Sequence, residues 1–368
     1  MMSVQRRVGQ IPWISKTMGE PMGAKRVRFS LAAAAKPHDG PSMLRLTGLL
    51  AFAAFAASGM PLAAHGQTYP VRSITVVVPF PAGGASDVVA RIVTEHMGRT
   101  LGVQMVIENV GGAGGTLGSA RVAAAAADGY TLLAGSMGSH VAAPVLTPNL
   151  KYDSERDFEP IGLTAYSPAV VVARKDFPAK TAIEFVTQLK QDGDKIKQAH
   201  GGIGASSHMA CVLFNTAAGA RPTSVAYRGT GPAMNDLVGG HVDYLCEQSV
   251  SVAEQIQADR VKGYVVSSNR RLASLPNILS AREAGIDFQM SIWAGIFAPK
   301  NTPKYIVAKL AAALDKALDD HGVAKRLADL GGSIPTKPER KPEIFNRLVK
   351  AEIARWSPIL KAASPTAQ

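Results

Sequence analysis

Residues 74–87 read ITVVVPFPAGGASD, and this stretch decides the fold. Its first half is a run of apolar, mostly β-branched residues, as expected of a strand buried on both faces. Its second half passes through Gly83 and Gly84 to Ser86 and Asp87, which are residue types that begin helices. An apolar stripe at helical spacing follows, formed by Val88, Val89, Ile92, Val93, Met97 and Leu101. A buried strand that turns through glycines into a helix is the first unit of an α/β fold.

The same alternation continues along the chain. Further strands are predicted at Val103–Glu108, Tyr130–Ala134, Ala169–Ala173, Ser224–Tyr227, Val242–Cys246, Gly263–Ser267 and Ala294–Ala298. Helices are predicted at Thr116–Ala127, at Thr181–Leu189, at 207–219, from Pro303 through Leu318, and at Pro342–Leu360, where Pro358 should kink or fray the last turn. The pattern predicts an α/β fold with mostly parallel strands.

The N-terminal part of the chain is typical of an exported protein. No charged residue occurs from Leu46 to Ala64, and the unbroken apolar part, about 12 residues long, is nearer a signal peptide than the roughly 20 residues of a membrane span. We predict that residues 1–66 are a leader and signal peptide and that the mature chain begins near Gln67. The chain is therefore predicted to be exported.

Removal of the leader would halve the net positive charge of the chain. The whole chain has a formal net charge of +12, but residues 67–368 carry only +6. No basic block with interleaved aromatic residues remains, so we expect no nucleic-acid partner. Histidine and cysteine spacing gives no zinc pattern, the glycines of 111–118 fail the dinucleotide fingerprint, and no phosphate-binding loop of the Walker type occurs, so no metal or cofactor is expected.

Several strand ends lead into loops rich in glycine and serine: Gly83-Gly84, residues 135–139, Gly201–Ser207 and residues 229–231. In an open α/β sheet the ligand crevice lies beyond the carboxyl ends of the strands, where helix N-termini offer free N–H groups. These loops could simply be tight turns. Together, and with few Lys or Arg among them, they favour an anion held by backbone amides and hydroxyls.

No linker divides residues 67–368, so two domains must share the chain through crossing strands, which we place near Gly162–Val170 and Gln289–Ala294. The predicted domains are 67–168 plus 290–368, and 169–289, with the last helix packing on the first domain.

Five segments together resemble one family. They are PFPAGG at 79–84 with Asp87, NVGGAGG at 109–115, Ser206-Ser207-His208, YRGTGPA at 227–233 and GGHVD at 239–243. In order and spacing they resemble the Bug (bordetella uptake gene) family, the substrate-binding proteins of tripartite tricarboxylate transporters. The resemblance covers Tyr69 to Ala362.

The resemblance implies a fold like that of type II periplasmic binding proteins, with two α/β domains joined by crossing strands that close on a small carboxylated solute like a flytrap. It also implies where the ligand binds. The Gly83 and Gly84 amides would face the ligand carboxylate, Phe80 would shield the cleft, Tyr227 would form its second-domain wall, and Asp87 would cap the helix. The expected ligand-binding residues are Phe80, Pro81, Ala82, Gly83, Gly84, Asp87, Ser136, Ser139, His140, Gly204, Ala205, Ser206, Ser207, Tyr227, Gly229, Thr230 and Gln248.

The two cysteines, Cys211 and Cys246, depart from the commoner residues of the family. In an oxidising compartment they can form one disulfide, and two buried free thiols are the alternative. A bridge would stiffen the second domain without blocking hinge closure.

The leading hypothesis is a monomeric periplasmic receptor, not an enzyme, that captures a di- or tricarboxylate, an amino acid or an aromatic acid for a tripartite transporter or a sensor. One alternative is a secreted serine hydrolase built on Ser136, because residues 134–138, AGSMG, faintly resemble a nucleophile elbow. The other alternative is an envelope interaction protein without a small ligand.

Overall fold

The computed structural model describes residues 68–363. The predicted leader and signal peptide, residues 1–66, lie outside the described residues. Of the part that is described, no helix combines the length and apolar character that a membrane crossing requires. The described residues, 68–363, form one compact unit.

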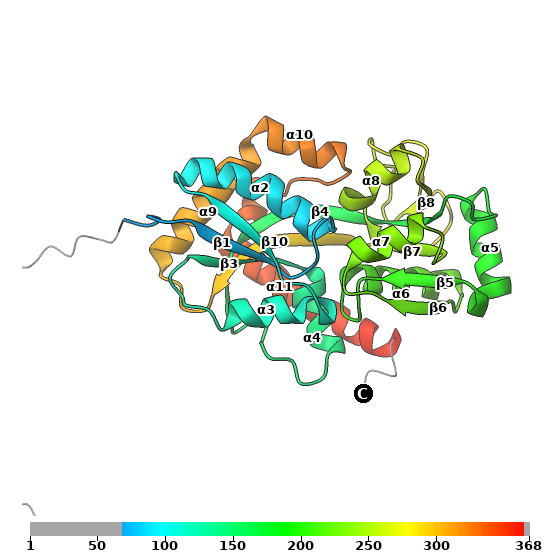
Figure 1. Ribbon diagram of the computed structural model, residues 1–368, viewed down its shortest axis with the longest axis horizontal. Helices are drawn as coiled ribbons and strands as arrows, with labels where there is room; N and C mark the ends of the chain where they lie inside the picture. The colour runs from blue at the N-terminus through cyan, green and yellow to red at the C-terminus, as the bar shows by residue number, and fades with distance from the viewer. Residues whose placement is uncertain (1–67, 364–368) are drawn as a thin grey trace, which may run out of the picture. The chain divides into compact units, whose positions relative to one another are not determined.

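The strands and helices alternate as predicted over most of the chain (Figure 1). In chain order the elements are β1 (Ile74–Val78), α2 (Ala85–Leu101), β2 (Met105–Asn109), η2 (Ala113–Gly115), α3 (Thr116–Ala123), β3 (Thr131–Ser136), η3 (Gly138–Ala142), α4 (Ala143–Leu146), β4 (Phe158–Arg174), α5 (Ala182–Asp192), η4 (Gly193–Lys195), β5 (Lys197–His200), α6 (Ser206–Ala218), β6 (Thr223–Ala226), α7 (Thr230–Val238), β7 (Tyr244–Gln248), α8 (Ser249–Gln257), β8 (Val261–Val266), β9 (Leu279–Ser280), β10 (Ser291–Pro299), α9 (Lys304–Asp319), α10 (His321–Asp329), η5 (Lys337–Arg340) and α11 (Pro342–Ala363).

The deciding stretch folds as its residues predict. In β1 only Thr75 is not fully buried, which fits a strand covered on both faces. Helix α2 starts after Gly84 and buries Val89, Ile92, Val93 and Met97 on one side. It ends at Gly102, whose φ of 72° is the left-handed conformation that commonly closes a helix.

The sheet is mixed rather than mostly parallel. Its strand order is β2-β1-β3-β10-β4-β7-β5-β6, with β8 paired to β4 and β9 paired to β8. Within the described residues the antiparallel pairings all involve β4 or β10. β4 and β10 are antiparallel to each other and lie in the middle of the strand order. The alternation of strands and helices along the sequence does not predict the direction of these two strands.

β4 divides the sheet into two groups of strands. Its first part pairs with β10 as far as Pro168 and Ser291, and β7 takes over as its partner from Ala169 and Gln248. We call β1, β2, β3, β10 and residues 158–168 of β4 the first strand group, and β5 to β9 with residues 169–174 the second. The assignment of two domains with limits at 168/169 and 289/290 stays a prediction.

Several details differ from the predicted elements, and three of them are instructive. α3 ends at Ala123 rather than Ala127. α11 continues past Pro358 to Ala363, so this proline does not end the helix. The strand β5, with the polar sequence KQAH, was not predicted.

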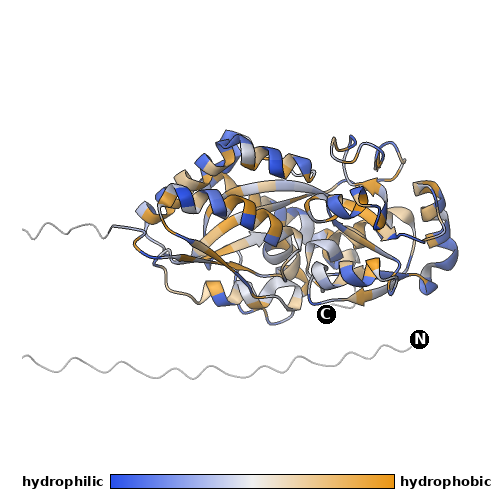
Figure 2. Cartoon of the chain, turned by 45° about the horizontal axis from the view of Figure 1, so that its top comes forward, coloured by the Kyte–Doolittle hydropathy of each residue, from blue (hydrophilic) through white to orange (hydrophobic). Residues whose placement is uncertain are grey.

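Hydrophobic residues gather on the strands and the inward faces of the helices, and hydrophilic ones on the outside (Figure 2). The core of the second strand group contains the two cysteines. Cys211 of α6 and Cys246 of β7 are joined by a disulfide, with Cα atoms 5.1 Å apart. Both pack with Phe214 and Tyr244. The bridge therefore links a helix to a strand of the same group and does not cross between the groups.

Candidate functional site

Glycine loops from the two strand groups lie directly against each other. We call this contact region the seam. On one side are residues 81–84, 111–115 and 138–143, which follow β1, β2 and β3 of the first strand group. On the other side are residues 201–206 and 229–231, which follow β5 and β6 of the second. A Cβ atom added to Gly231 would lie 2.8 Å from the Ala82 carbonyl oxygen, and one added to Gly138 would lie 2.8 Å from the Ser206 nitrogen. One added to Gly229 would overlap Pro81, and one added to Gly114 would overlap the Ile203 carbonyl. The backbones therefore approach as closely as only glycine permits.

A cavity of about 520 Å³ opens at this seam. Both strand groups line it, through Pro81, Ala82, Gly83, Thr230, Gly231, Pro232, Met234, Asn235, Glu247, Ser251 and Gln255. The lining contains no Lys, Arg or His, and Glu247 is its one titratable side chain. A solute in this cavity would contact both groups at once.

Helix N-termini surround the seam without side-chain caps. The N-cap residues of α2, α6, α7 and α8 are Gly84, Ala205, Gly229 and Gln248, and none caps its helix through a side chain. By contrast, Thr181 caps α5 and Asp320 caps α10, away from the seam. Uncapped N-termini leave N–H groups for other partners, and their dipoles favour a negative charge. The arrangement suits a carboxylate.

Asp87 braces the first loop from within. Its side chain accepts hydrogen bonds from the Gly83 N–H at 3.0 Å, from Arg91 Nε at 2.9 Å and from Asn109 Nδ2 at 2.9 Å. Burial alone would raise the pKa of Asp87, but the hydrogen bonds from Arg91, Gly83 and Asn109 together lower it. The Gly83 amide, which we expected to face the ligand, therefore binds Asp87. Asp87 is not the N-cap either, since Gly84 holds that position.

Replacing Asp87 with asparagine should destabilise the fold by about 1.5–3 kcal/mol, the range for hydrogen bonds to a charged group. The pKa of Asp87 is lower in the folded state than in the unfolded state. The ionised carboxylate therefore stabilises the fold at pH values above its unfolded-state pKa, and this stabilisation is lost as the pH falls through the folded-state pKa. The difference from wild type should therefore be full at pH 7 and shrink below about pH 4. Urea unfolding at several pH values measures it.

Asp329→Asn is the matched control, since Asp329 pairs with Lys325 on the exposed face of α10. Its cost should stay below about 0.5 kcal/mol. Equal losses in the two variants would contradict the bracing role of Asp87.

The two aromatic residues that we expected at the cleft pack elsewhere. The Tyr227 hydroxyl donates to Asp236 of α7 at 2.6 Å, and burial, followed by the hydrogen bond and the charge of Asp236, raises the pKa of Tyr227 to about 12. The Phe80 ring lies against Gly115. Neither ring lines the cavity. Both side chains pack against elements of the seam and do not contact the cavity.

Ser136, Ser139 and His140 form a buried cluster after β3. Ser139 Oγ accepts the Ser136 N–H and lies 3.0 Å from His140 Nδ1. The His140 ring stacks on Phe297 at 3.9 Å, and burial lowers the pKa of His140 to about 3, so the ring is neutral. The Ser136 hydroxyl has no hydrogen-bond partner. Because His140 Nδ1 contacts the Ser139 hydroxyl and the Ser136 hydroxyl has no partner, the geometry gives the hydrolase alternative no support.

The remaining expected residues occupy the seam or the starts of its helices. Gly204 and Ser206 contact the first strand group near Ala143 and Gly138. Ser207 Oγ accepts the Gly201 N–H at 2.9 Å and so holds its own loop. Thr230 begins α7 and lines the cavity, and Gln248 precedes α8.

Sequence reasoning missed several residues of this region, and two of them bear polar side chains that matter to the site. Asn109 ties the Phe80 carbonyl to Asp87, and Glu247 faces the cavity from the end of β7. A signal for Glu247 existed, because it is a carboxylate that directly follows the apolar run Leu245-Cys246 in a predicted strand.

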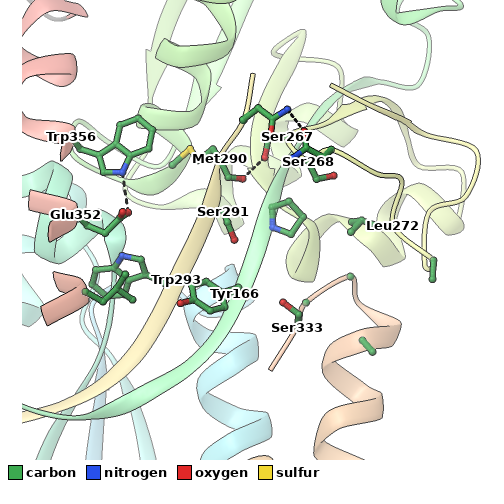
Figure 3. A pocket seen from close by; sticks show the side chains of 18 of the residues that line it. Tyr166, Ser267, Ser268, Leu272, Met290, Ser291, Trp293, Ser333, Glu352 and Trp356 are labelled. Atoms are coloured by element: carbon green, nitrogen blue, oxygen red, sulfur yellow. Dashed lines mark hydrogen bonds between the residues drawn. The ribbon is translucent and has the colours of Figure 1, made fainter. Parts of the chain in front are cut away.

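A second cavity, of about 670 Å³, lies beside the crossing strands (Figure 3). Tyr166 of β4 and Trp293 of β10 line it together with Glu352 and Trp356 of α11. At its edge the Ser267 hydroxyl accepts the Ala169 N–H and donates to the Met290 carbonyl, so it links the chain at both crossings. This cavity shares no lining residue with the seam cavity.

The chain is similar to a known receptor family and to solved binding proteins. The family model described as tripartite tricarboxylate transporter family receptor matches residues 89–364. A UPF0065 protein of Agrobacterium vitis is 40% identical over 306 residues, which cover 83% of this chain and 88% of the relative.

Two solved structures match with high coverage. MatC from Rhodopseudomonas palustris, solved with bound malate, is 45% identical with a TM-score of 0.76, covering 79% of this chain and all of MatC. The periplasmic binding protein BugD is 41% identical with a TM-score of 0.78, covering 80% of this chain and 99% of BugD.

Proposed function

This chain belongs to the family of tripartite tricarboxylate transporter receptors, and on that premise we propose that it is a periplasmic receptor that encloses a small carboxylate at the seam. The Bug resemblance and the predicted fold class are confirmed. The receptor would pass its solute to a tripartite transporter or to a sensor and would catalyse no reaction.

One observation carries the proposal. The uncapped start of α7 and the first turn of α8 line a cavity that residues 81–83, just before α2, line from the other strand group, and Glu247 is the one titratable side chain in its lining. Neutral donors held by a rigid backbone can replace the water around a carboxylate without a counter-charge.

The solute class follows from the size of the cavity and from the relatives. A cavity of about 520 Å³ accommodates a small organic acid. MatC, the solved relative at 45% identity, binds malate. We therefore propose that the solute is a small dicarboxylate or a related organic acid.

The test is thermal unfolding of residues 67–368, first unfolded and refolded to remove co-purified solute, with a panel of carboxylates that includes malate. A carboxylate present at 100 times its Kd should stabilise the fold by about 2.7 kcal/mol, a rise in Tm of about 4 °C. The diamide of each acid serves as the uncharged control and should have no effect. If no carboxylate stabilised the protein, the envelope interaction protein would become the better interpretation.

A further inference from the structure

Glu247 is a buried acid with one oxygen unused. Its side chain is 2% exposed, and Oε1 accepts the Gln248 N–H at 2.9 Å. Oε2 is buried and has no hydrogen-bond partner. The hydroxyls of Thr230 and Ser251 lie near the carboxyl group, but neither makes a bond of ordinary geometry to Oε2. The residue lines the cavity at the seam, and a shift of the side chains that cover Oε2 would bring this oxygen into contact with a bound solute.

No cation compensates this carboxyl group. Burial raises the pKa of Glu247 to about 7, the Gln248 N–H and the hydroxyls of Thr230 and Ser251 lower it less, and no charged neighbour contributes. Asp87 of α2, which follows the facing loop, is bound to Arg91.

The charged groups on the elements packed around β7 are occupied or exposed. Arg174 of β4 pairs with Asp243, and Asp236 of α7 accepts from Tyr227. Glu159 of β4 pairs with Lys300, while Lys197 of β5 and Glu254 of α8 are exposed.

The two histidines of this region lie on the other face of the sheet. His200 of β5 and His208 of α6 have ring centroids 4.6 Å apart. His208 shares α6 with Cys211, which is bonded to Cys246. Since side chains alternate along a strand, Glu247 points to the opposite face from Cys246, where Leu245 packs against residues of α7 and α8. Neither histidine can serve as its counter-charge.

A bound carboxylate would bring a second negative charge into this cavity. Two carboxylates that share a buried site cannot both stay ionised, so one of them takes up a proton. We propose that Glu247 is the protonated partner and that it donates a hydrogen bond from Oε2 to a carboxylate oxygen of the solute. Above the pKa of free Glu247, one proton then enters from solvent with each solute bound, and no heavy-atom bond forms or breaks. This inference rests on the proposed function and identifies the side chain that binds the carboxylate of the solute.

The proposal predicts how affinity changes with pH. Below the pKa of free Glu247 the proton is already present, and above it the proton must be taken up, so the Kd should rise by about tenfold per pH unit above pH 7. An ionised Glu247 that paired with an amino group of the solute would give the opposite trend, because deprotonation would then favour binding.

The experiment is titration calorimetry of residues 67–368 with L-malate, between pH 6 and pH 9. At pH 8, buffers of different ionisation enthalpy should report uptake of close to one proton per malate bound. In Glu247→Gln the amide supplies a permanent donor, so proton uptake should vanish and the Kd should become flat with pH. Glu254→Gln, at the exposed position on α8, should retain the wild-type profile.

The outcomes separate the two proposals. Malate binding with a flat pH profile and no proton uptake in the wild-type protein would overturn the role of Glu247 while leaving the receptor function intact. Absence of binding by malate and by the whole carboxylate panel would overturn both. The wild-type pH profile and calorimetry decide the matter even if Glu247→Gln fails to fold.

Discussion

Replacing Gly114 with alanine should weaken carboxylate binding by about 10- to 100-fold. The new Cβ would overlap the Ile203 carbonyl across the seam, and an inserted methyl group in a packed contact costs about 1–3 kcal/mol. The two loops can avoid the clash only by moving apart, which opens the cavity. The apparent Kd is inversely proportional to the fraction of closed protein, so it rises as that fraction falls.

Gly102→Ala is the matched control for the backbone. Gly114 has a φ of 65° and Gly102 a φ of 72°, so alanine is strained similarly at both positions, but a Cβ on Gly102 would meet nothing within 4 Å. Urea unfolding without ligand should show a similar loss of about 1 kcal/mol in both variants. Calorimetry should show weaker binding in Gly114→Ala alone. Equal affinities would mean that the loops do not press together in the bound state.

The second large effect concerns the disulfide. Replacing both Cys211 and Cys246 with alanine should lower the free energy of unfolding by about 3–4 kcal/mol, which corresponds to a fall of about 5 °C in Tm. The physical reason is that the bridge closes a loop with a sequence separation of 35 residues and so restricts the unfolded chain. Thermal unfolding under non-reducing conditions measures this change.

Reductant provides the control for the disulfide. Dithiothreitol should lower the Tm of the wild-type protein toward that of the double variant and leave the variant unchanged. Alkylation of unreduced protein from the periplasm should label neither cysteine. Two labelled thiols, or equal Tm values without reductant, would contradict a bridge in the native protein. Because the bridge lies within one strand group, malate affinity should change little.

The parts of the fold with strong local patterns could be predicted from the sequence. An unbroken run of β-branched residues predicts β1, and an apolar stripe at helical spacing predicts α2. β5 could not be found in this way, because its four residues KQAH are polar or small although Gln198, Ala199 and His200 are buried. Its place is set by parallel pairing with β6 and β7, which is tertiary information.

The candidate site, too, could be predicted only in part. Glycines at strand ends identify the loops of the seam, because only glycine tolerates such close backbone contact. Which N–H groups stay free cannot be predicted, since the Gly83 amide is bound by Asp87, a residue four positions along the chain. Glu247 was not predicted as a site residue, because an acidic side chain at the end of a strand is usually exposed to solvent. Here it is buried, and it lines the cavity together with residues 81–83 from the other strand group.

The most direct test of the account is a crystal structure of residues 67–368 with the carboxylate that stabilises the protein most. We expect the solute in the seam cavity, in contact with residues 81–84 on one side and with Thr230 and Glu247 on the other. A solute in the cavity beside the crossing strands (Figure 3), or one bound outside the seam altogether, would contradict it.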